Sequence, residues 1–165
     1  WPIIEKALGE AIGQMMQMRG DEGRSMQNDL SGNLAMLRER LETIEQAAPQ
    51  VAEDFRQRLT ERVGRILSEH DVRLEAGDVI REVAIFADRC DISEEIVRFK
   101  SHLDQFDAIM QSEESLGRKL DFLIQEMNRE VNTIGSKANH VVITQTVVDL
   151  KSIIERMREM VQNVE

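Results

Sequence analysis

The chain has 165 residues, a formal net charge of -10 and 32% charged residues. This acidity argues against a general nucleic-acid clamp, because phosphate binding needs a concentrated positive surface, and no uncharged apolar run approaches the ~20 residues that span a membrane. A single cysteine excludes an internal disulfide, which fits a reducing, cytoplasmic compartment.

Composition and the first residues predict an all-α domain that is part of a longer protein. Only two prolines and no tyrosine occur, and residues that favour helices are abundant. Trp1-Pro2 carries neither an initiator Met nor a signal peptide, so we expect further sequence upstream. The expected architecture is a long antiparallel helical arm or hairpin over residues 1–75 plus a helical bundle over 76–165, together forming one continuous domain.

The first helical stretch has apolar residues at alternating spacings of four and three, which is typical of a helix that packs on another helix. They are Ile4, Leu8, Ala11, Met15 and Met18, then Leu30, Leu34, Leu37, Leu41, Ile44 and Ala48 after a phase slip. One helix or two over 3–47 both fit this pattern, and one helix would be roughly 65 Å long. We expect Pro49 to stop or restart the helix and residues 51–69 to complete an antiparallel arm.

Two further helices are predicted after a break near Gly77. The first runs over 79–91, with Cys90 on its apolar face, where core packing is more plausible than a role as nucleophile. Asp91 and Glu94 have the spacing of a capping box, and an unbroken apolar stripe follows over 92–110.

The last two predicted helices differ in how clearly the sequence marks them. Ser112 suits a helix start before the stripe over 116–134, and Gly135 is the expected stop. The segment VVITQTVV is rich in β-branched residues, which favour strands. Its apolar spacing of four and three nevertheless continues over 143–164, so we expect a helix there.

Two polar clusters could carry chemistry, although Gly-rich phosphate loops, paired metal-binding histidines and nucleophile elbows are absent. Glu95, Arg98 and His102 share one helix face, opposite the apolar stripe. Together they could bind a metal ion and a phosphate, but an exposed surface of ion pairs is the more ordinary interpretation.

The second cluster is GRKLDFLIQEMNREVNTIGSK, residues 117–137. Asp121 lies there on a stripe of amide side chains, while Glu126 and Glu130 lie one turn apart on a neighbouring stripe. Glutamates at that spacing can share a divalent cation. They can equally pair with Arg129 or Lys137, and the sequence leaves both uses open.

The motifs just described resemble the C-terminal domain of the YicC/YloC family of bacterial proteins. The likeness rests on residues 117–137, on VVDLKSIIERMREMVQNVE at 147–165 and on DISEEIVRFKSHLDQF at 91–106. Upstream, RGDEGRSMQNDL at 19–30 resembles the family's Arg, Glu-Gly and Asp-Leu pattern. Trp1-Pro2 is similar to the junction after the family's N-terminal domain, so that domain would precede this chain.

This resemblance implies a metal-dependent endoribonuclease that prefers Mn²⁺, with Mg²⁺ as the alternative, and that cleaves single-stranded or small regulatory RNA. It also implies a ring-like homo-oligomer, with a hexamer as the expected form, and neither a membrane nor DNA as a partner. The RNA track would need the N-terminal domain, because this chain is acidic. The competing hypothesis is a non-catalytic helical oligomerisation or adaptor module in RNA turnover.

The family's polar positions, carried onto this sequence, give a set of candidate site residues. We expect Glu126, Glu130 and His102 to be catalytic, with Glu95, Glu126, Glu130 and Asp121 as metal ligands. The expected RNA and phosphate contacts are Arg98, Arg118, Lys119, Arg129, Asn132 and Lys137.

Overall fold

The computed structural model describes residues 1–70, 76–112 and 117–162. Its elements, in chain order, are α1 (Pro2–His70), α2 (Ala76–Cys90), α3 (Ser93–Met110), α4 (Gly117–Lys137) and α5 (Val141–Val161). The predicted all-α fold is therefore confirmed, including a helix over the β-branched VVITQTVV segment. The expected limits at residues 75, 116 and 164 lie outside the described residues. In the described part of the chain, no helix has the length and apolar character needed to cross a bilayer.

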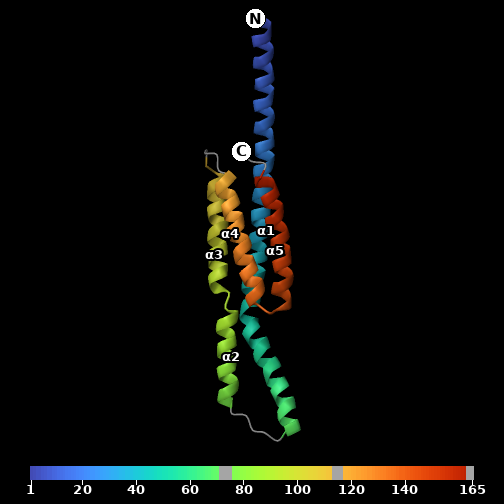
Figure 1. Cartoon of the computed structure of the whole chain (residues 1–165), viewed down its shortest axis with the longest axis vertical. Helices are drawn as coiled ribbons and strands as arrows, with labels where there is room; N and C mark the ends of the chain where they lie inside the picture. Colours follow the sequence, from blue (N-terminus) through green and yellow to red (C-terminus); the bar gives the residue numbers. More distant parts are fainter. Residues whose placement is uncertain (71–75, 113–116, 163–165) are drawn as a thin grey trace.

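Helix α1 is continuous over 69 residues and contains Pro49 in its interior. The expectation that Pro49 stops or restarts the helix is therefore wrong. Proline removes one backbone hydrogen bond and bends a helix, but packing on both sides can hold the helix together. Val51 is buried beyond the proline, and the Phe55 ring stacks on Phe86 of α2 with 3.6 Å between ring centroids. The ribbon changes direction where α1 leaves the bundle (Figure 1).

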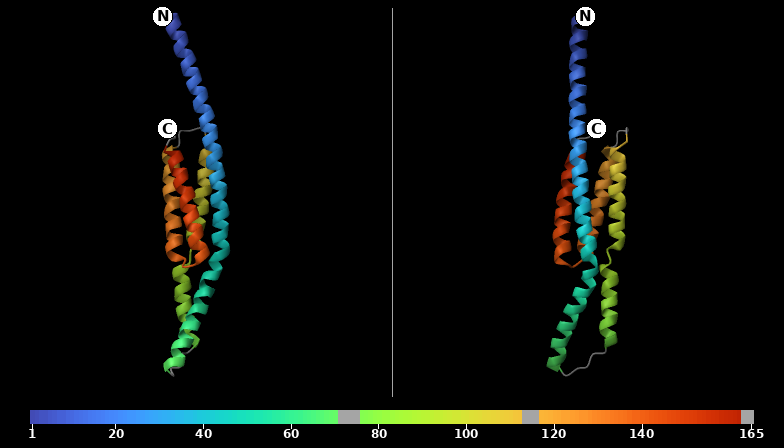
Figure 2. Two further views of the ribbon diagram at one scale, coloured as in Figure 1. Left: turned by 90° about the vertical axis from the view of Figure 1, so that its right-hand side faces the viewer. Right: turned by 180° about the vertical axis from the view of Figure 1, so that it is seen from behind.

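The antiparallel partner of the second half of α1 is α2. Because α1 does not break, residues 51–69 do not fold back on residues 3–47, and the expected arm within 1–75 is corrected in that respect. Instead, α2 returns alongside the last third of α1 in all three views (Figures 1 and 2). We call residues 51–70 with α2 the α1–α2 hairpin.

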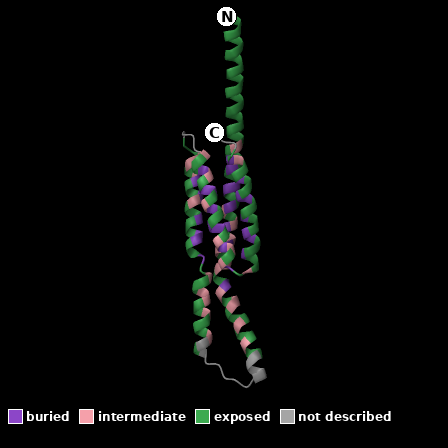
Figure 3. Ribbon diagram, in the orientation of Figure 1, coloured by how far each residue is buried: buried purple, intermediate pink, exposed green. Residues whose placement is uncertain are grey.

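The core lies where residues 30–51 of α1 pack with α3, α4 and α5 (Figure 3). The residues here include Leu34, Leu37, Phe99, Phe106, Met127 and Leu150, all at most 2% exposed. This single core takes side chains from both sides of the expected division at residues 75 and 76. Ion pairs from Arg38 to Asp104 and from Lys100 to Glu45 connect α1 to α3 outside the core.

Two predicted helix boundaries are wrong for local reasons. Gly135 does not stop α4, which continues to Lys137. A Cβ at this position would lie 3.0 Å from Cγ1 of Val147, so the glycine permits the close approach of α4 and α5. The capping box is absent at the start of α3, because Asp91 accepts hydrogen bonds from the backbone and hydroxyl of Ser93, and Glu94 accepts one from Arg98.

Ser112 was expected to start a helix but instead lies beyond the end of α3. Its backbone amide and its hydroxyl both donate hydrogen bonds to the carbonyl oxygen of Ile109. The next helix, α4, begins at Gly117. The serine therefore contacts the preceding helix.

The first 25 residues are exposed and extend beyond the end of the bundle (Figures 2 and 3). We call residues 2–25 of α1 the projecting segment. Its exposed large apolar side chains are Ile3, Ile4, Leu8, Ile12, Met15, Met16 and Met18. Among the described residues, no other helix packs on the apolar stripe predicted over 4–18.

Candidate metal and phosphate site

Three of the residues expected to be catalytic converge between α3 and α4. His102 lies on α3, and Glu126 and Glu130 lie one turn apart on α4. One ligand atom from each residue lies within 4.8 Å of the others. We call these three residues the cluster. Two consecutive helices thus place an imidazole and two carboxylates around one point.

The cluster contains polar atoms whose hydrogen-bonding needs are unmet. Glu130 is 1% exposed, and its Oε1 atom has no hydrogen-bond partner among the residues that the structure describes. The Nδ1 atom of His102 is likewise buried without a partner. Leaving such atoms unpaired costs free energy unless a ligand, water or ion satisfies them. Two carboxylates and an imidazole are suitable ligands for Mn²⁺ and related divalent cations, so the donor set fits a metal ion.

Two arginines border the carboxylates of the cluster. Nη1 of Arg129 lies 3.1 Å from Oε2 of Glu126, and its Nη2 lies 3.5 Å from Oε1 of Glu130. Arg98 donates a 2.7 Å hydrogen bond to Glu94, while its Nη1 lies 4.0 Å from Oε2 of Glu130. Both guanidinium groups are half-exposed or more, so they can meet a ligand that arrives from solvent.

Glu95 faces α4 from the same side of α3 but has a different partner. It is 4% exposed, and its Oε1 accepts a 2.8 Å hydrogen bond from Nζ of Lys137. Lys137 also donates to the backbone carbonyl of Asp91, between α2 and α3. The expected exposed ion-pair face is thus partly buried against α4. Glu95 and Lys137 form a polar pair about two helical turns from His102 and Glu130, and no signal in the sequence indicates this pairing because it depends on the register of α3 against α4.

The remaining expected residues lie elsewhere on α4. Asp121 is five residues before Glu126, which places it about 140° around the helix, and it accepts a hydrogen bond from Gln125. Asn132 is exposed on that other side as well. Lys119 lies two turns before Glu126 on the same face, about 10 Å along the axis, and Arg118 is exposed beside it. The structure therefore does not bring Asp121 and Asn132 to the cluster.

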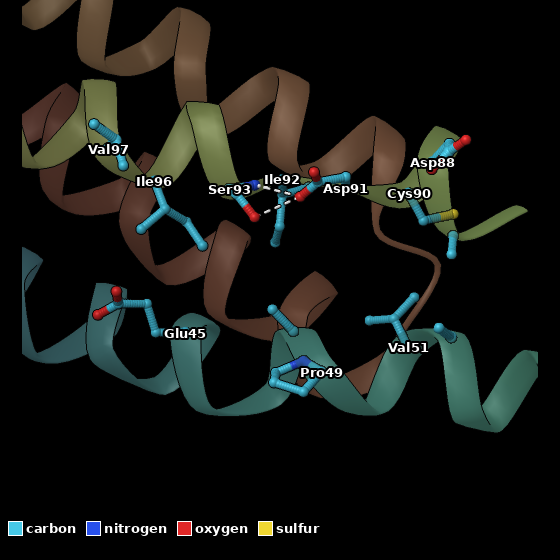
Figure 4. A pocket seen from close by; sticks show the side chains of 13 residues that line it. Glu45, Pro49, Val51, Asp88, Cys90, Asp91, Ile92, Ser93, Ile96 and Val97 are labelled. Atoms are coloured by element: carbon cyan, nitrogen blue, oxygen red, sulfur yellow. Dashed lines mark hydrogen bonds between the residues drawn. The ribbon is translucent and has the colours of Figure 1, made fainter. Parts of the chain in front are cut away.

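A pocket of about 590 Å³ lies away from the cluster, at the bend of α1 and the junction of α2 and α3 (Figure 4). Its walls include Pro49, Val51, Cys90 and Ile92, and none of the expected site residues lines it. Burial raises the pKa of the Cys90 thiol. The side chain of Cys90 packs against the core as expected. This pocket is mostly apolar, and sequence reasoning gave no signal for it because it arises only where Pro49 meets the junction.

Asp91 lies on the rim of this pocket, and its carboxylate faces Ser93 (Figure 4). Hydrogen bonds from the hydroxyl and the backbone amide of Ser93 hold the pKa of Asp91 below its ordinary value. These bonds belong to the turn between α2 and α3. They support the local fold and contribute nothing to the cluster.

Comparison with known proteins adds an independent line of argument. Residues 44–165 match the protein family described as endoribonuclease YicC-like, C-terminal. The chain is 41% identical over 165 residues to a protein of Clostridioides difficile named "Probable endoribonuclease YicC". The matched region covers 100% of this chain and 56% of that relative. A protein of the same name from Haemophilus influenzae is 33% identical over 159 residues, covering 96% of this chain and 54% of that relative. The chain therefore spans about half the length of these relatives.

Proposed function

Because the chain belongs to the endoribonuclease YicC-like family, we propose that it carries the metal-dependent active site of an endoribonuclease acting on single-stranded or small regulatory RNA. The observation that carries this proposal is the convergence of His102, Glu126 and Glu130 within 4.8 Å. Unpartnered buried atoms on two of these residues support it further, since such atoms call for a ligand.

The cluster would hold the cation, with Mn²⁺ preferred and Mg²⁺ as the alternative. Such a cation, when bound, stabilises negative charge on a phosphate and makes a water or a ribose 2'-hydroxyl a better nucleophile. Arg98 and Arg129 are placed to donate hydrogen bonds to the phosphate, because both lie beside the cluster and are accessible from solvent. Lys137 would support the site without contacting the phosphate, since it donates hydrogen bonds to Glu95 and to the turn before α3.

Charge explains how an acidic chain can bind a phosphate at this one place. Two guanidinium groups lie beside three carboxylates, those of Glu94, Glu126 and Glu130, so a divalent cation would leave the site with a local charge of about +1. A phosphodiester carries one negative charge and is attracted to that site, although the chain as a whole has a net charge of -10. A longer RNA would still need a positive surface beyond these residues, which fits a partner domain upstream.

We propose a homo-oligomer, with a hexameric ring as the expected form, built through the projecting segment. That segment exposes a stripe of large apolar side chains, and exposed stripes of this kind commonly mark protein interfaces. Light scattering on the chain and on a Leu8→Gln variant tests this. The wild-type mass should be a multiple of the 19.0 kDa chain and should fall in the variant.

The test of the active site is cleavage of a labelled single-stranded RNA with Mn²⁺, Mg²⁺ or a chelator. It should use this chain and a longer chain that includes the upstream sequence. We expect Glu130→Gln and Glu126→Gln each to lower the metal-dependent rate by about 100-fold or more, because a carboxamide is a poor cation ligand. Glu155→Gln, an exposed glutamate on α5 that also pairs with an arginine three residues away, is the matched control.

The alternative is a helical adaptor that does not itself cleave RNA. The exposed projecting segment favours it, as does the pairing of Arg129 with both carboxylates, which could be purely structural. The same assay separates the two hypotheses. No cleavage by either chain, or cleavage by the longer chain alone that survives both glutamine substitutions, would favour the adaptor. Metal-dependent cleavage by this chain that survives both substitutions would place the active site away from the cluster.

A further inference from the structure

The position of Arg129 suggests a function beyond phosphate binding. We infer that Arg129 is an internal, displaceable cation: it holds Glu126 and Glu130 until a divalent cation binds them, and it then turns to an anion at the same site. The inference rests on the proposed metal site and specifies how that site is regulated. It makes Arg129 the residue that couples metal binding to recognition of a phosphodiester.

Arg129 competes for the oxygens that a cation would need. Its Nη1 lies 3.1 Å and 3.5 Å from the two carboxylate oxygens of Glu126, and its Nη2 lies 3.5 Å from Oε1 of Glu130. That Oε1 atom is buried and accepts no hydrogen bond from any described residue. The guanidinium therefore neutralises Glu130 by charge without satisfying its hydrogen bond, so a small divalent cation can offer this oxygen a better contact.

Solvent exposure distinguishes the Arg129 side chain from the carboxylates that it contacts. The Arg129 side chain is 61% exposed, whereas the side chains of Glu126 and Glu130 are 24% and 2% exposed. An exposed arginine changes rotamer at little cost, and solvent partly screens its pair with Glu126, while its 3.5 Å contact with Glu130 lacks a hydrogen bond. The carboxylates are held by packing between α3 and α4, so Arg129 is the member that moves.

Arg98 is placed differently with respect to the two carboxylates. It donates a 2.7 Å hydrogen bond to Glu94 on the preceding turn of α3 and lies 4.0 Å from Glu130. Its position does not bridge the two carboxylates. The site therefore has one guanidinium that lies on both carboxylates, Arg129, and one that does not, Arg98, and binding of the cation frees the first for a phosphate.

The first test is the Mn²⁺ affinity of the 165-residue chain, measured by electron paramagnetic resonance of free Mn²⁺. Arg129→Gln should bind Mn²⁺ about tenfold more tightly than wild type, because the competing positive charge is gone. Arg158→Gln is the matched control. Arg158 also pairs with a glutamate three residues before it, Glu155 on α5, so the substitution removes the same charge without touching the cluster, and the affinity should not change.

The second test asks directly whether Arg129 is released. Phenylglyoxal modifies accessible arginines, and mass spectrometry gives the rate at each one. Saturating Mn²⁺ should raise the rate at Arg129 about threefold or more, because a guanidinium released from two carboxylates is more open to the reagent. The rate at Arg158 should stay the same with and without Mn²⁺.

The outcomes separate this inference from the proposal on which it rests. Wild type that binds no Mn²⁺, with Glu130→Gln giving the same result, would overturn the metal site and this inference together. Mn²⁺ binding that is lost in Glu130→Gln but equal or weaker in Arg129→Gln would overturn the inference alone. An unchanged phenylglyoxal rate at Arg129 in the presence of bound Mn²⁺ would also overturn it, since the guanidinium would then not have moved.

Discussion

Two parts of α1 carry the same apolar spacing but have opposite surroundings. In residues 30–44 the leucines and Ile44 are at most 3% exposed, because α3 and α5 pack against this part of α1. In the projecting segment, Leu8 is 60% and Met18 is 65% exposed. The spacing of four and three therefore predicts a helix and the face that can pack, but it says nothing about which element will cover that face.

This comparison predicts that equal substitutions will have unequal effects. Leu37→Ala should lower the free energy of unfolding by about 2–5 kcal/mol, because Leu37 is fully buried and its loss leaves a cavity. Leu8→Ala should change it by less than about 0.5 kcal/mol at concentrations where the chain is monomeric. Urea unfolding followed by circular dichroism measures both, and equal losses would mean that the projecting segment is packed in solution.

Glycine substitutions should differ even in sign. Gly135→Ala should destabilise the bundle by about 1 kcal/mol, because the new Cβ meets the buried, β-branched Val147 at 3.0 Å. Gly13→Ala has open space around it and should stabilise the projecting helix by up to about 1 kcal/mol through helix propensity. Urea unfolding tests the first. Amide hydrogen exchange over residues 2–25 tests the second, with slower exchange expected in the variant.

Cys90 is an intermediate case, on the half-buried face of the α1–α2 hairpin. We expect the effect of its partial burial, on thiol reactivity and on stability, to be the smallest of these effects. Burial raises the thiol pKa, so folding disfavours the thiolate. At a pH below the thiol's ordinary pKa, the raised pKa has no effect on the free energy of unfolding. The free energy of unfolding falls as the pH rises through that ordinary pKa, because the unfolded chain then loses the thiol proton first. Alkylation by iodoacetamide at pH 8 should be slower than in the urea-unfolded chain, by a factor of about 3. Equal rates would mean that the hairpin opens readily.

The fold was largely predictable because the helices have strong periodic patterns. The errors in the prediction arose where tertiary contacts override local sequence preferences. Pro49 has an ordinary helix-breaking character, but Val51 and the stacking of Phe55 on Phe86 hold the helix on its far side. Gly135 suits a helix end by propensity, yet here it allows α4 to approach Val147. Neither contact can be seen from neighbouring residues, since each joins segments that are distant in sequence.

The candidate site was predictable in part. The spacing of Glu126 and Glu130 already placed them on one face of a helix, and helix geometry alone also places Asp121 about 140° away from Glu126. The position of His102 opposite them depends on the register of α3 against α4, which the packing of buried side chains determines. From its spacing on α3, Glu95 could have been either a metal ligand beside His102 or a member of an ion pair. Only the register of α3 against α4 pairs it with Lys137.

The continuity of α1 also has a mechanical consequence. Residues 2–26 form a lever about 36 Å long whose base is fixed among the bundle helices. A rotation of the base by about 10° would carry the tip of this lever through about 6 Å. A partner bound at the tip would therefore be displaced by several ångströms when the bundle rearranges slightly. Conversely, force applied at the tip would be transmitted along α1 to the helices that carry His102 and Glu130.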